Sequence, residues 1–79
     1  MITAKLTVLG KKYTSEGATL DEALRGLKPG GVAMKGILEV DNGTSKRERI
    51  LAHGMLKRLF HLSPTMREMA LKQVTLLFS

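Results

Sequence analysis

The chain has 79 residues, no cysteine, one tyrosine and two phenylalanines, and it carries 13 lysines and arginines against seven aspartates and glutamates. This length supports one domain with a small core and leaves little room for a large substrate pocket, while the lack of cysteine excludes disulfides and thiolate metal sites. The net charge of +6 and pI near 10.1 favour an anionic partner, such as nucleic acid or the acidic surface of another protein.

The first eight residues alternate polar and apolar side chains, so they are too polar and too short for a secretion signal. No later apolar run approaches the roughly 18 residues that a membrane-spanning helix needs. The sequence therefore predicts a protein of the bacterial-type cytoplasm with no membrane partner.

Residues 2–8 place an apolar side chain at every second position, which predicts a strand with one buried face. A turn follows at Gly10-Lys11-Lys12, and residues 13–17 are typical of a short polar return strand near the edge of a sheet. We interpret Lys11 and Lys12, at the tip of this hairpin, as solvating charges.

A helix is predicted to start at Thr19, because Thr19-Leu20-Asp21-Glu22 forms a capping box. In this motif the Thr19 hydroxyl accepts a hydrogen bond from the Glu22 amide, and the Glu22 carboxylate reaches back to the Thr19 amide. An apolar stripe follows at Leu20, Ala23, Leu24 and Leu27. Pro29 ends the predicted helix, and Gly30-Gly31 is a connector, not a phosphate loop, because no Lys-Ser/Thr pair or helix start follows it.

A β-hairpin is predicted for residues 35–51. Its first arm, residues 36–40, is apolar and β-branched, and Asp41-Asn42-Gly43-Thr44 supplies residues that tolerate the backbone angles of a turn. The returning arm alternates so that Arg47 and Arg49 lie on the face opposite Lys46 and Glu48. Two interpretations are open: a solvated strand that its charges protect from aggregation, or a surface that meets phosphate or an acidic partner.

A short amphipathic helix is predicted for residues 52–60. Its apolar face carries Ala52, Met55, Leu56, Leu59 and Phe60, and its basic side carries Lys57 and Arg58. If this helix packs beside the hairpin arm, the two basic elements form one positive surface. The candidate partner-binding residues are therefore Lys46, Arg47, Arg49, Lys57 and Arg58.

The two histidines, His53 and His61, lack the i, i+4 spacing that places two imidazoles on one metal ion, and no cysteine completes a tetrahedral set. The spacing of residues along the sequence also suggests no catalytic site with a nucleophile, a base and an oxyanion donor. The sequence therefore predicts no metal site, no cofactor and no enzymatic activity.

The chain closes with a predicted helix followed by an ambiguous segment. Ser63-Pro64 precedes a second capping box, Thr65-Met66-Arg67-Glu68, and the inner stripe of this short helix consists of Met66, Met69 and Ala70. We interpret Met55, Met66 and Met69 as gap fillers of a small core. Residues 73–78 are β-branched and aromatic, which favours a closing strand, although Val74 and Leu77 also continue the helical stripe.

Together these elements predict a single α+β domain over residues 1–79. It contains two β-hairpins with a short intervening helix, then one or two short C-terminal helices and the closing strand.

The order of these elements resembles that of small, uncharacterised proteins of tailed bacteriophages and prophages. The resemblance rests on three segments, which are residues 17–24 (GATLDEAL), 35–40 (KGILEV) and 47–51 (RERIL). It implies an origin in a phage and a place in the host cytoplasm, and none of its motifs is catalytic. Phage proteins of this kind are often inhibitors or modifiers of host machinery, and others are minor assembly components.

The leading functional hypothesis is a basic, non-enzymatic module that occupies an anionic surface of a host protein or nucleic acid through the candidate residues above. The scarcity of aromatic residues favours protein, because single-strand binders stack bases on aromatic rings. A helix-turn-helix over residues 52–73 is an alternative, with Thr65, Arg67, Glu68, Lys72 and Gln73 on its second helix. Against it, the join at residues 61–65 lacks the usual glycine.

The rival hypothesis is a homo-oligomeric structural or assembly subunit of a phage particle. In this case edge strands and the apolar segment Leu76-Leu77-Phe78 pair with copies of the same chain.

Overall fold

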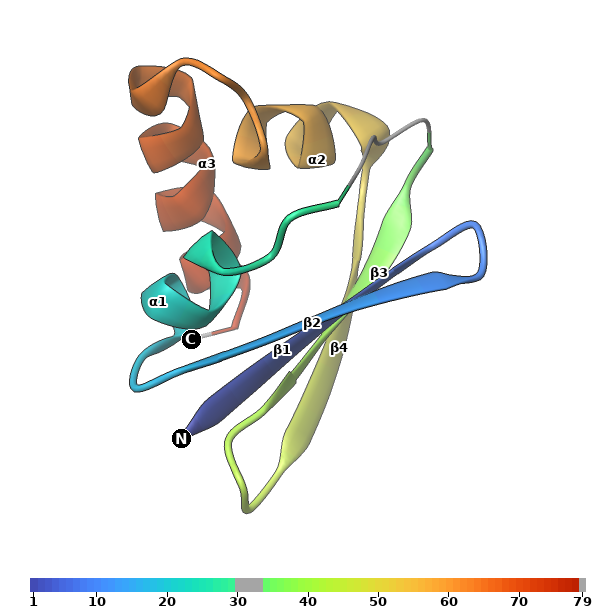
Figure 1. Cartoon of the computed structure of the whole chain (residues 1–79), viewed down its shortest axis with the longest axis vertical. Helices are drawn as coiled ribbons and strands as arrows, with labels where there is room; N and C mark the ends of the chain where they lie inside the picture. Colours follow the sequence, from blue (N-terminus) through green and yellow to red (C-terminus); the bar gives the residue numbers. More distant parts are fainter. Residues whose placement is uncertain (30–33, 79) are drawn as a thin grey trace.

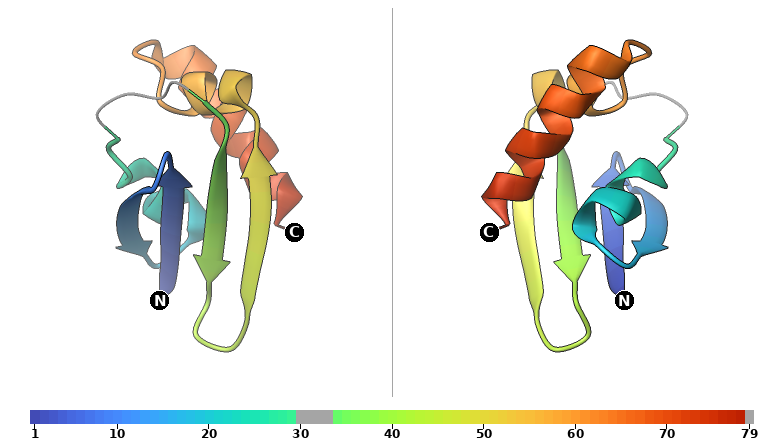
Figure 2. Two further views of the ribbon diagram at one scale, coloured as in Figure 1. Left: turned by 90° about the vertical axis from the view of Figure 1, so that its right-hand side faces the viewer. Right: turned by 90° about the vertical axis from the view of Figure 1, so that its left-hand side faces the viewer.

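The computed structural model describes residues 1–29 and 34–78. Its elements in chain order are β1 (Ile2–Val8), β2 (Lys11–Gly17), α1 (Leu20–Arg25), β3 (Gly36–Asp41), β4 (Lys46–Leu51), α2 (His53–Leu59) and α3 (Pro64–Leu77). They form a twisted sheet with α1, α2 and α3 on one of its faces (Figures 1 and 2). The predicted α+β fold, with two hairpins and C-terminal helices, is confirmed. No described helix is long and apolar enough to cross a bilayer.

The sheet has the strand order β2-β1-β3-β4, and every neighbouring pair is antiparallel. The two hairpins therefore meet through β1 and β3, while β2 and β4 form the edges. The first hairpin turns on Leu9 and Gly10, which have φ angles of 53° and 78°. Two consecutive residues with positive φ are the mark of a tight type I′ turn. As a result Lys11 and Lys12 belong to β2, and the prediction that placed them in the turn is wrong.

The core lies between the helices and the face of the sheet that they cover. Alternate residues of the central strands, among them Leu6 and Leu38, point to this face and are fully buried. The other core residues are Ala4, Val8, Ala23, Leu24, Leu27, Leu51, Leu56, Leu59, Ala70, Leu71 and Val74. No described helix covers the opposite face of the sheet (Figure 2). That face carries polar and charged residues together with Ile37 and Ile50, which are 44% and 67% exposed.

The start of α1 confirms the predicted capping box in its main feature. The Thr19 hydroxyl accepts a hydrogen bond from the Glu22 amide at 3.2 Å, while the Glu22 carboxylate accepts from the amide of Ala18 at 3.0 Å instead of that of Thr19. The helix ends at Arg25, before the predicted stop at Pro29. Leu27 is nevertheless buried, at 3% exposure, because the chain turns it back into the core. The predicted connector at residues 30–31 lies outside the described residues.

The predicted closing strand at residues 73–78 is wrong, because α3 continues to Leu77 over 14 residues. Val74 is fully buried and lies four positions after Ala70, which is also buried, so helical continuation keeps both side chains in the core. The predicted inner stripe is correspondingly displaced: Met66 and Met69 are 39% and 58% exposed, while Ala70 and Leu71 face inward. The second capping box does not form a side-chain cap either.

Candidate anion-binding surface

The β3–β4 hairpin is held by its turn. The Asn42 Oδ1 accepts hydrogen bonds from the amides of Thr44 and Ser45 at 3.0 and 2.8 Å, and the Asp41 Oδ1 accepts from the amide of Gly43 at 2.8 Å. Gly43 has a φ of 94°, a conformation that favours glycine. These local contacts set the register of β4 and thereby the face to which each of its cations points.

The alternation predicted for β4 is confirmed by its pairing with β3. Arg47 lies opposite Val40 and Arg49 opposite the buried Leu38, so both arginines point to the face that the helices cover. Lys46 and Glu48 point to the uncovered face. Both arginines are nevertheless exposed, because β4 is an edge strand.

Both arginines contact Phe78, the residue that ends α3. The Arg47 Nη1 donates a hydrogen bond to the Phe78 carbonyl at 3.1 Å, which places a cation at the negative end of the helix dipole. The Arg49 guanidinium lies 5.8 Å from the centre of the Phe78 ring, within the range of a cation–π contact, and donates to the Glu48 carbonyl at 2.7 Å. Sequence reasoning missed this role of Phe78, since only the fold brings the two segments together.

The charge of Arg47 and Arg49 is not neutralised by a carboxylate in the described part of the chain. Carbonyl groups and an aromatic ring orient the two guanidinium groups but carry no full negative charge. A guanidinium has five N–H donors, so each arginine retains donors for a further acceptor. The two side chains are therefore oriented, and no described carboxylate occupies their remaining donors.

A cleft of about 360 Å³ lies next to Arg47, between the sheet and the ends of α1 and α3. Its apolar wall is formed by Ile2, Leu20, Val40 and Phe78. The cleft therefore joins an apolar surface to one guanidinium, an arrangement suited to a group with both an apolar part and a negative charge.

The other three predicted residues lie elsewhere. Lys46 is on the uncovered face of the sheet, across from Arg47 and Arg49. Lys57 and Arg58 are exposed on α2, which follows the far end of β4 from the β3–β4 turn (Figure 1). The structure thus brings together two of the five candidate residues, Arg47 and Arg49. The other three lie elsewhere, one on the uncovered face of the sheet and two on α2.

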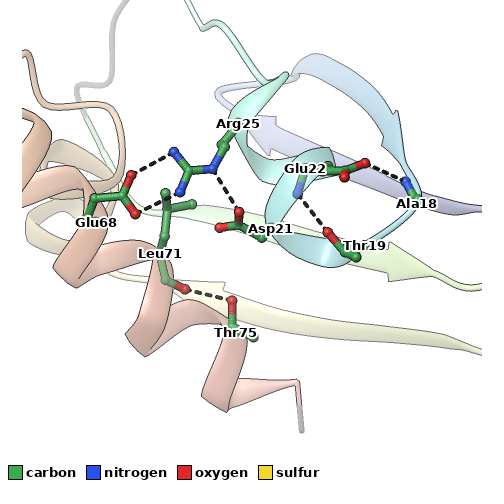
Figure 3. A network of polar contacts seen from close by, with 8 residues as sticks. All are labelled: Ala18, Thr19, Asp21, Glu22, Arg25, Glu68, Leu71 and Thr75. Atoms are coloured by element: carbon green, nitrogen blue, oxygen red, sulfur yellow. Dashed lines mark hydrogen bonds and ion pairs between the residues drawn. The ribbon is translucent and has the colours of Figure 1, made fainter.

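A second polar cluster ties α1 to α3 (Figure 3). Arg25 contacts Asp21 at 2.8 Å and forms a two-pronged ion pair with Glu68, in which both contacts are 2.7 Å. The hydrogen bond from Arg25 lowers the pKa of Glu68 below its ordinary value, and the bonds to Glu68 and then Asp21 raise the pKa of Arg25. The Asp21 to Arg25 spacing of i, i+4 was a detectable signal in the sequence, whereas the Glu68 partner was not.

His61, one of the two histidines, has a local hydrogen-bond partner. The His61 Nδ1 accepts a hydrogen bond from the Ser63 amide at 2.9 Å in the join between α2 and α3. No group of three or more potential metal ligands occurs among the described residues. Glu68, one of the residues that the helix-turn-helix hypothesis directs to DNA, is held by Arg25 on α1.

Comparison of the chain with protein-family models, with curated proteins and with solved structures finds no match in any of the three.

Proposed function

We propose that the protein is a small, non-enzymatic binding module whose β4 edge receives an acidic, extended segment of another protein. The observation that carries this proposal is the pair of oriented arginines, Arg47 and Arg49, whose charge no carboxylate of the described chain neutralises. Both lie on an edge strand and Arg47 also lines an apolar cleft, which supports a peptide as the partner.

The backbone of β4 supports the same mode of binding. In an antiparallel pair, residues alternate between bonding to the neighbouring strand and pointing their N–H and C=O groups away from it. The turn bond from the Asn42 amide to the Ser45 carbonyl makes Lys46, Glu48 and Ile50 the residues that point outward. An added strand would bond to these three residues, while its acidic side chains reach Arg47 and Arg49.

Protein is favoured over duplex nucleic acid because the five candidate cations are not gathered on one face. Phosphate binding draws its affinity from many cations along one surface. Here Lys57 and Arg58 are on α2, which lies at the far end of β4 from the β3–β4 turn (Figure 1). Glu48 also stands between the two arginines in sequence, on the edge itself. The resemblance to small phage proteins makes acidic proteins of a bacterial host the first partners to examine.

The test uses a fluorescent, extended peptide that alternates glutamate and valine, and measures its binding by fluorescence anisotropy. We expect the double change Arg47→Glu and Arg49→Glu to weaken binding about tenfold or more, since two charge-assisted contacts become repulsive. The matched control is Lys57→Glu with Arg58→Glu, which makes the same change in net charge on α2 and should change affinity much less.

A duplex DNA probe under the same conditions separates the two classes of partner. Tighter binding of the DNA than of the peptide, with a steep loss of affinity in salt, would replace the proposal by nucleic-acid binding. Equal losses in the two double variants would show that net charge, and not the β4 edge, determines affinity.

A further inference from the structure

β2 forms one edge of the sheet, and no described strand pairs with its outer side. β2 has seven residues and contains no proline, and β1 is its strand partner among the described residues. The tight turn makes Val8 and Lys11 a hydrogen-bonded pair, so alternation points the N–H and C=O groups of Lys12, Thr14 and Glu16 away from β1. Unpaired groups of this kind are a template for another strand.

We propose that β2 pairs antiparallel with β2 of a second copy of the chain, about a two-fold axis at Thr14. Thr14 is the central residue of β2, so this register pairs every residue of the strand. It places Lys12 opposite Glu16 of the second copy, and Glu16 opposite Lys12 of the second copy. Opposite charges that face each other across strands are stabilising, and the symmetry of the pair produces this contact twice.

The exposed charges of β2 support a second copy of the chain as its partner. Lys12 and Glu16 are exposed and form no ion pair within the described chain. A register centred on Tyr13 would place Lys12 opposite Thr14 and leave Glu16 without a charged partner. The register centred on Thr14 is therefore the one that satisfies both charges.

Antiparallel pairing of β4 with β4 of a second copy is disfavoured by its charges. Pairing β4 with itself about an axis at Arg47, Glu48 or Arg49 places that residue opposite its own copy. The axis at Arg47 also pairs Lys46 with Glu48, but it sets the two Arg47 side chains against each other. Like charges that face each other across strands are destabilising. The sequence of β4 therefore disfavours self-pairing, and β2 is the edge suited to a second copy.

The helix-covered side of β2 is compatible with this arrangement. α1 lies over the C-terminal half of β2, where a side chain added at Gly17 would come within 2.7 Å of the Ala23 amide nitrogen. Because the pairing is antiparallel, the two copies of α1 sit over opposite halves of the joined strands. The half-buried Tyr13 then lies opposite Ser15 of the second copy, and the two four-stranded sheets join into one.

The first test measures molar mass by light scattering coupled to size exclusion over a wide range of concentrations. We expect the 8.7 kDa chain to reach twice that mass. Lys12→Glu and Glu16→Lys should each weaken the dimer about 10- to 100-fold, because both contacts become like-charged. An equimolar mixture of these two variants should form a mixed dimer, in which both contacts are again between opposite charges.

The matched controls are Lys46→Glu and Glu48→Lys, which make the same charge changes at the other edge and should leave the dimer unchanged. A wild-type mass that stays at the monomer value, or a mixture that stays monomeric, would overturn the proposal. An assembly that grows past the dimer would overturn it as well, and would indicate head-to-tail pairing of β2 with β4.

The second test uses the absence of cysteine from the chain. Thr14→Cys places one thiol at the proposed axis, where residues paired across antiparallel strands have Cα atoms about 5.5 Å apart, within reach of a disulfide. Under mild oxidation this variant should form a covalent dimer far faster than Glu48→Cys, which carries its thiol at the centre of β4. Equal rates would contradict pairing through β2.

Discussion

The two edges of the sheet expose the same backbone groups but order their charges differently. β2 has one exposed cation and one exposed anion at equal distances from Thr14 on the uncovered face, Lys12 and Glu16. β4 has three cations around a single anion, Glu48, and two of the cations lie on the helix-covered side. We infer that charge order decides the partner of each edge, which is a copy of the chain at β2 and an acidic segment at β4.

The edges also differ in the helix behind them. α1 covers β2 and is short, with six residues, whereas the 14-residue α3 reaches β4 through Phe78 at its end. The Arg25 to Glu68 ion pair connects the two helices. Damage to α1 should therefore affect the β2 edge first, and the β4 edge should respond to changes at the end of α3.

The largest effect is expected from Leu24→Ala, which removes a side chain of α1 that is 1% exposed. The loss of buried surface and the resulting cavity should lower the free energy of unfolding by about 2–5 kcal/mol, enough to unfold part of the population of so small a protein. Urea denaturation measures this effect. Leu76→Ala on α3, where the side chain is 71% exposed, is the control and should cost no more than about 0.5 kcal/mol.

Thr19→Ala should have an intermediate effect, because it removes the oxygen that caps α1 at the Glu22 amide. Loss of an N-cap costs about 1 kcal/mol. Thr19→Ser retains the hydroxyl and should keep most of the stability in the same denaturation experiment. Equal midpoints for the alanine and serine variants would show that the cap does not stabilise α1.

Charge reversals at one edge should weaken binding at that edge alone, with little effect on folding. Arg47→Glu with Arg49→Glu should shift the free energy of unfolding by about 0–1 kcal/mol, because the contacts with Phe78 are exposed. The same variant should still dimerise, while Lys12→Glu should still bind the acidic peptide. A variant that loses both activities while its thermal melting curve stays native would contradict the separation of the two edges.

The smallest effect is expected in the pH dependence of stability. The pKa of Glu68 is lower in the folded state than its ordinary value because Arg25 donates hydrogen bonds to it. Its contribution to stability is therefore fully present above that ordinary value and is lost as the pH falls through the folded value. Glu68→Gln should flatten this part of the acid denaturation curve, and an unchanged slope would show that the ion pair does not stabilise the fold.

Much of the fold could be predicted from local patterns in the sequence. The alternation of residues 2–8, the Asp41 to Thr44 turn and the Thr19 cap each depend on neighbours within a few positions, so the chain specifies them without knowledge of the rest. The same holds for the separation of Arg47 and Arg49 from Lys46 and Glu48, since strand alternation alone decides it. The edge position of β2 followed from its polar composition.

The rest was decided by contacts between distant segments. Residues 73–77 fit a strand by composition but form a helix, because the buried positions of Ala70, Leu71 and Val74 keep α3 on the core. Because of the same packing, Met66 and Met69 are exposed and Phe78 contacts the arginines of β4. Hydrophobic periodicity indicates that a helix has a buried face. It does not predict which side of the helix the neighbouring elements will cover.

The sequence by itself determined the class of the fold, the two hairpins and the faces to which their side chains point, because these follow from the geometry of single strands and turns. Only the tertiary structure decided that α2, which carries Lys57 and Arg58, lies at the far end of β4 from the β3–β4 turn (Figure 1). It also decided that Arg25 is neutralised while Arg47 meets no carboxylate of residues 1–29 and 34–78. Net charge is a sum over the whole chain, and binding depends on where packing places each charge.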